Sequence, residues 1–132
     1  MNLTSEEKRI IVPAIIKLFR KRTGERKAIK GYDVIIQYLQ GIIPKDHKVV
    51  LKERSVRKCI SHIREYPQVY KIFIMANSNG FFVPQTKEEA HEFIKRWVAY
   101  MKTMQRVYDG ILNYAKELPS ANTEIGFPKN EE

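Results

Sequence analysis

The sequence has few of the features that cross-link a chain or insert it into a membrane. It contains a single cysteine, Cys59, among 132 residues, so no internal disulfide can form. Its most apolar stretches, residues 10–16 and 70–76, are far shorter than the roughly 20 residues that span a bilayer. Residues 1–7 also lack the apolar segment of a secretory signal peptide. We therefore expect a protein of the reducing cytoplasm that does not enter the membrane.

The motifs of common catalytic and metal sites are also missing. There is no glycine loop for phosphate, no His-Glu-x-x-His and no carboxylate pair beside a nucleophile. Ser61 and His62 are neighbours on a predicted helix, so their side chains diverge by about 100° and cannot act as nucleophile and base. Cys59, His62 and His47 lack the spacing of a structural zinc site. We expect no enzymatic activity, no cofactor and no bound metal.

Positive charge is in excess. The chain has 24 Lys and Arg against 15 Asp and Glu, a net charge of +9. Residues 1–68 hold 16 basic and 7 acidic residues and so carry +9, whereas residues 69–118 carry +2 and residues 119–132 carry −2. A hydrophobic content of 43% excludes a disordered chain. The balance favours a polyanionic partner, nucleic acid before an anionic membrane, bound by the N-terminal half.

Capping signals and apolar spacing predict two helices before residue 42. Thr4 and Glu7 form a capping box that starts the first helix. Pro13 either kinks this helix or begins a new one, and Gly24 suits a left-handed cap at its end. A short second helix is expected over residues 31–41. The first connector adds a basic cluster that we expect to raise affinity without specificity: Arg20, Lys21, Arg22, Arg26, Lys27 and Lys30.

A third helix, residues 54–66, has two chemically different faces. Its apolar residues recur at spacings of three and four, which predicts a buried stripe. They are Val56, Cys59, Ile60 and Ile63. The opposite face is basic and hydrogen-bonding, with Arg54, Lys58 and Ser61 at its centre and Arg57 and His62 beside them.

A β-hairpin and a long helix follow. Residues 69–75 have strand composition, Asn77-Ser78-Asn79-Gly80 indicates a turn, and residues 80–84 form the return strand. The hairpin aromatics suit stacking on single-stranded nucleic acid, but the alternation of strand faces favours core packing. Thr86 is expected to cap a helix that ends near Leu118.

Apolar residues of this last helix alternate at spacings of four and three over residues 90–118. At about 1.5 Å per residue the helix is roughly 50 Å long, and its wide stripe predicts packing on its own domain and on another chain. We divide the chain into residues 1–85, the helix 86–118 and an irregular tail 119–132. The residues expected to form the dimer are Trp97, Met101, Met104, Tyr108 and Ile111.

The order of these elements resembles a winged helix-turn-helix domain, a mainly α (α+β) fold with a β-hairpin wing. Residues 54–64, Arg-Ser-Val-Arg-Lys-Cys-Ile-Ser-His-Ile-Arg, resemble the recognition helices of that superfamily. Residues 74–89 resemble the wing of small phage and prophage winged-helix proteins, in which a similar segment leads into a long C-terminal helix. The resemblance covers about residues 9–118.

The resemblance implies a double-stranded DNA-binding protein of a bacterial or phage-infected cell, active in phage regulation or replication, and the stripe of the last helix predicts that it is a homodimer. The third helix would enter the major groove and the wing would contact the backbone. Expected contacts are Arg54, Ser55, Arg57, Lys58, Ser61 and His62 from the helix, and Lys71, Asn77 and Asn79 from the hairpin. Two alternatives stay open: a winged-helix adaptor for proteins in phage replication or packaging, and a chiefly structural dimer.

Overall fold

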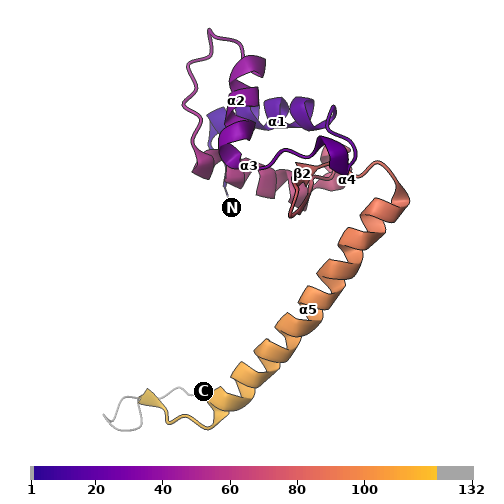
Figure 1. Ribbon diagram of the computed structural model, residues 1–132. Helices are drawn as coiled ribbons and strands as arrows, with labels where there is room; N and C mark the ends of the chain where they lie inside the picture. Colours follow the sequence, from indigo (N-terminus) through magenta and orange to yellow (C-terminus); the bar gives the residue numbers. More distant parts are fainter. Residues whose placement is uncertain (1, 122–132) are drawn as a thin grey trace. The chain divides into compact units, whose positions relative to one another are not determined.

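The computed structural model describes residues 2–121, which divide into two compact units, residues 2–93 and residues 94–121. The chain is mainly helical with one small antiparallel sheet, as the sequence predicts (Figure 1). None of the helices in the described part of the chain combines the length and the apolar character needed to cross a membrane.

The N-terminal helix begins at the predicted capping box. The Thr4 amide donates to Oε1 of Glu7 (2.8 Å), and the Glu7 amide donates to Oγ1 of Thr4 (3.1 Å). A π-helical turn, η1 (Glu7–Ile11), leads directly into α1 (Val12–Phe19). Pro13 has no amide and its ring crowds the carbonyl four residues earlier, so a wider turn just before it keeps the helix continuous. Of the two alternatives, the structure thus supports one helix that continues through Pro13, not a new helix that begins there.

The expected cap at Gly24 is wrong. Helix α1 ends at Phe19, and Gly24 has φ +89° and ψ 148°, outside the left-handed helical region. Gly24 precedes a short 3₁₀ turn, η2 (Glu25–Lys27), and its amide donates to the carbonyl of Val83 (2.8 Å). Its positive φ therefore serves a long-range backbone contact, which local sequence does not reveal.

Helices α2 (Tyr32–Ile42) and α3 (Glu53–Glu65) complete the core with α1. Helix α2 passes through Gly41, where we expected it to stop, and ends one residue later. The connector between the two helices is irregular, but Val49 and Leu51 are half-buried against the core. The predicted stripe of α3 is confirmed: Val56, Cys59, Ile60 and Ile63 are each at most 2% exposed.

The hairpin forms at the predicted turn, but its first strand is shorter than expected. Residues 67–70 are a helical turn, α4 (Pro67–Tyr70), because proline fits the first position of a helix. Strands β1 (Met75–Asn77) and β2 (Gly80–Phe82) then pair antiparallel, with Met75 opposite Phe82.

A third segment lies along the hairpin. Ile29 exchanges both backbone hydrogen bonds with Phe81, at 2.8 and 2.9 Å, so the chain between α1 and α2 pairs with β2. Gly80 has φ +117°, and a Cβ there would overlap the backbone carbonyl of Ile29. Only glycine allows the two backbones to approach this closely.

The first unit also includes the start of α5 (Lys87–Lys116). The predicted cap is confirmed, because the Glu89 amide donates to Oγ1 of Thr86 (3.2 Å). Phe93 packs with Met75 and Phe82 in a second small core, so this unit extends beyond residue 85. Phe82 is 1% exposed, which confirms core packing for this hairpin aromatic.

In the second unit, α5 continues from Ile94 with its side chains exposed. Of the residues of α5, Phe93 is the buried one. The predicted tail begins at Pro119, and residues 122–132 lie outside the described residues.

Candidate nucleic-acid interface

The outward face of α3 carries Arg54 and Ser61, both exposed. The two residues lie two turns apart, opposite the buried stripe. Arg54 forms no ion pair with any residue in the described part of the chain. A guanidinium and a hydroxyl are therefore available to a ligand on this face.

Arg57 lies at one side of this face and has two internal contacts. It forms an ion pair with Glu53, one turn earlier, and its guanidinium carbon is 5.0 Å from the centre of the Tyr32 ring on α2. The Arg57 and Glu53 side chains are 59% and 57% exposed, so water screens their attraction. Arg57 is held in place and still accessible to phosphate.

Lys58 lies on the other side and points towards the N-terminal helix. Its Nζ is 2.9 Å from Oε1 of Glu7, a carboxylate that is only 5% exposed. Burial raises the pKa of Glu7, but hydrogen bonds from the Thr4 amide and from Lys58 outweigh it and leave that pKa below its ordinary value. Lys58 therefore joins α3 to η1 through this ion pair. Glu7 was not predicted from the sequence as its partner.

His62 joins α3 to α4. Its Nε2 is 2.7 Å from the hydroxyl of Tyr70, and its ring contacts the rings of Tyr66 and Tyr70 at centroid distances of 5.0 and 5.6 Å. The side chain is half-buried, as is that of Ser55. Both lie at the edge of the outward face, and the hydrogen bond of His62 is internal.

The hairpin residues differ in their surroundings. Lys71 is exposed, in a left-handed conformation with φ 58°. The side-chain amides of Asn77 and Asn79 both donate to Oε2 of Glu25, the former at 3.0 Å. This role of Glu25 was not predicted from the sequence. Its carboxylate brings negative charge to the hairpin turn and connects the turn to η2.

Arg64 is a further basic residue of α3 that sequence reasoning left out. Its guanidinium lies over the rings of Phe73 and Phe93, 5.8 and 5.7 Å from their centres. Burial lowers the pKa of Arg64. Its position beside the apolar stripe of α3 could have indicated that it packs against the core. Its contacts join α3 to the segment before β1 and to the start of α5.

Cys59 lies inside the core, where burial raises the pKa of its thiol to about 12. A thiol with this pKa stays protonated near neutral pH and is a poor metal ligand. Among residues 2–121, no three His, Cys, Asp or Glu side chains gather in a group that could hold a metal ion.

A scan against protein-family models and searches of curated proteins and of solved structures found no match to this chain.

Proposed function

We propose that this protein binds double-stranded DNA by inserting α3 into the major groove, in a winged helix-turn-helix domain. The observation that carries the proposal is the outward face of α3, which presents Arg54, Arg57 and Ser61 opposite a fully buried stripe. The element order supports it, since α1, α2 and α3 are followed, after the short turn α4, by a hairpin whose second strand pairs with Ile29. That arrangement is the one expected of a winged helix.

The residues of this face suit different parts of a duplex. Arg54 has its guanidinium free for the two acceptors of guanine, and Ser61 fits a base edge or a phosphate. Arg57, already oriented by Tyr32, suits a phosphate. Lys58 and His62 are better explained as positioning residues of α3, because their polar atoms are engaged with Glu7 and Tyr70.

We further propose that two copies associate through α5. The apolar residues of α5 recur at spacings of four and three, and they are exposed in the single chain. Both features are typical of a helix that packs against the same helix of a second copy. The exposed residues of this stripe are Trp97, Met101, Met104, Tyr108 and Ile111. A dimer would hold two α3 helices for two half-sites, as suits phage regulation or replication in the cytoplasm. The same stripe supports the alternative of a protein-interaction adaptor.

Fluorescence anisotropy with labelled duplexes tests DNA binding. Arg54→Ala with Arg57→Ala should weaken binding by about 30-fold or more, because each arginine contact contributes about 1–3 kcal/mol. The control, Lys45→Ala with Lys48→Ala, removes equal charge from exposed residues of the connector and should cost only a few-fold. Equal losses in the two variants, with both folded by circular dichroism, would contradict a role for α3.

A further inference from the structure

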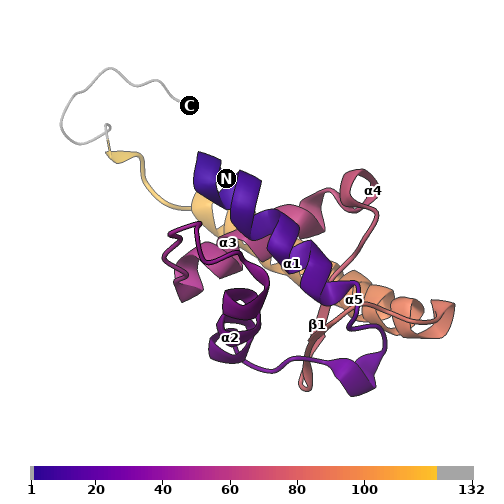
Figure 2. The same cartoon turned by 90° about the horizontal axis from the view of Figure 1, so that it is seen from above.

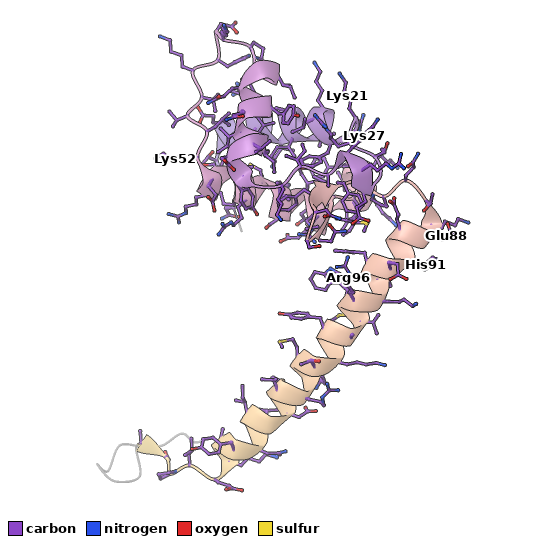
Figure 3. The ribbon with its side chains drawn as sticks, in the orientation of Figure 1. Lys21, Lys27, Lys52, Glu88, His91 and Arg96 are labelled. Carbon is purple, nitrogen blue, oxygen red and sulfur yellow. The ribbon has the colours of Figure 1, made fainter. Side chains whose placement is uncertain are left out.

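A second basic surface lies between α1 and α2, apart from the outward face of α3. It is a pocket of about 400 Å³. In Figure 2, α1 lies in front of α3, and in Figure 3 the labelled Lys21 and Lys27 project from the upper side of the first unit. The pocket residues are Lys17, Leu18, Lys21, Arg22, Lys27, Tyr38 and Ile42.

The charge of this pocket is not compensated. Four of its seven lining residues are Lys or Arg and none is acidic. None of these four forms an ion pair with another residue in the part of the chain that the structure describes. On α3, by contrast, Arg57 and Lys58 each have a carboxylate partner. Clustered cations without counter-charges favour an anion with several negative groups.

The pocket also has an ordered aromatic and apolar part. The guanidinium carbon of Arg22 lies 4.5 Å from the centre of the Tyr38 ring, which orients the arginine through a cation–π contact. Stacking uses the face of a guanidinium and leaves its N–H edge for an acceptor. Leu18 and Ile42 add aliphatic surface beside Tyr38, a residue that is 41% exposed.

We propose that this pocket binds a nucleoside triphosphate or a similar phosphorylated nucleoside. The phosphates would meet Lys17, Lys21 and Lys27, with Arg22 between them and the aromatic part, and the base would pack on Tyr38 and Ile42. The volume falls within the range of about 300–1,000 Å³ that small-ligand pockets occupy. A concave site of this size suits a small anion better than a rigid duplex.

Isothermal titration calorimetry with the full chain tests this site, using ATP, adenosine and tripolyphosphate as probes. ATP should bind, and adenosine and tripolyphosphate should each bind about 10-fold more weakly, because each lacks one part of the contact. Lys21→Gln with Lys27→Gln should weaken ATP binding by about 10-fold or more. Tyr38→Leu should weaken binding of ATP but leave tripolyphosphate unchanged.

The matched control is Lys45→Gln with Lys48→Gln, which removes the same charge outside the pocket. Unchanged ATP affinity in this control supports the site, whereas equal losses in both double variants overturn it, as does absence of ATP binding at about 10 mM. If the Lys21 and Lys27 variant lowers duplex affinity more than the control does, the surface is a second DNA contact and the nucleotide proposal is wrong. Because α3 is intact in the Lys21 and Lys27 variant, its ATP affinity tests the nucleotide site independently of the DNA proposal.

Discussion

The ion pair between Glu7 and Lys58 joins the N-terminal helix to α3 at a nearly buried position. A buried carboxylate without a partner is costly, so the lysine and the Thr4 amide together keep Glu7 ionised. The contact also restricts the rotation of α3 about its axis. The orientation of Arg54 and Ser61, the residues that we propose contact DNA, therefore depends on Lys58.

Replacing Lys58 by Met, which keeps most of the aliphatic stem, should lower the free energy of unfolding at pH 7 by about 1–3 kcal/mol, because Glu7 then loses a charged partner. In the wild type, the lowered pKa of Glu7 contributes stability above about pH 4.5 that disappears as the pH falls through the folded-state pKa.

The Lys58→Met variant should lose part of this acid dependence. Urea unfolding between pH 3 and 7 measures both effects, and Lys48→Met is a control at an exposed site. Parallel pH profiles for wild type and Lys58→Met would show that Glu7 does not depend on Lys58.

The stability of the β-hairpin depends on a contact with a segment that is distant in the sequence. Strands β1 and β2 have three residues each, which is short for an independent hairpin. The backbone pairing of Phe81 with Ile29 adds a third segment, and Phe82 and Phe93 supply a core beneath it. Gly80 is the residue at which the segments come closest.

Gly80→Ala should therefore destabilise the protein by about 2 kcal/mol or more, since both its φ and the Ile29 carbonyl oppose a side chain. Gly41→Ala is the matched control. Gly41 lies within α2 and a Cβ there meets nothing within 4 Å, so this change should stabilise by about 0.5–1 kcal/mol. Thermal melts measure both changes in stability. A Gly80 variant as stable as the Gly41 variant would contradict the close approach of Gly80 to the Ile29 backbone.

The features predicted correctly from sequence are local ones. The stripe of α3, the capping box at Thr4 and the cap at Thr86 each depend on residues within a few positions of one another. The features that were missed depend on long-range contacts: the pairing of Ile29 with Phe81 and the partners of Lys58 and Asn77 cannot be derived from periodicity. The sequence predicted the candidate site residues from their residue types. Tertiary packing determines which of them have an internal partner and which are available to a ligand.

At the scale of the whole molecule, the two units differ in character. Residues 2–93 enclose a core and carry most of the positive charge, whereas residues 94–116 of the second unit are a helix with an exposed apolar stripe. An exposed stripe of this length is costly in water, which favours association with another copy. In our proposal, DNA binding therefore belongs to the first unit and assembly to the second.

Met104→Glu should convert a dimer to a monomer, because it puts a charge in the apolar stripe. Thr103→Glu adds the same charge one residue away, outside the stripe, and should stay dimeric. Sedimentation equilibrium distinguishes the two variants. Duplex affinity should also fall in the monomer, because it presents one α3 to DNA where the proposed dimer presents two linked copies. A wild type that is monomeric at about 100 µM would contradict the dimer.

Amide chemical shifts of ¹⁵N-labelled protein, followed during titration with duplex DNA, would locate the DNA-binding surface residue by residue. If α3 enters the major groove, the largest changes will cluster on α3 around Arg54, Arg57 and Ser61, with smaller ones in the hairpin at Lys71. Changes confined to α1 and η2 around Lys21 and Lys27, or no changes at saturating duplex, would contradict insertion of α3 into the major groove.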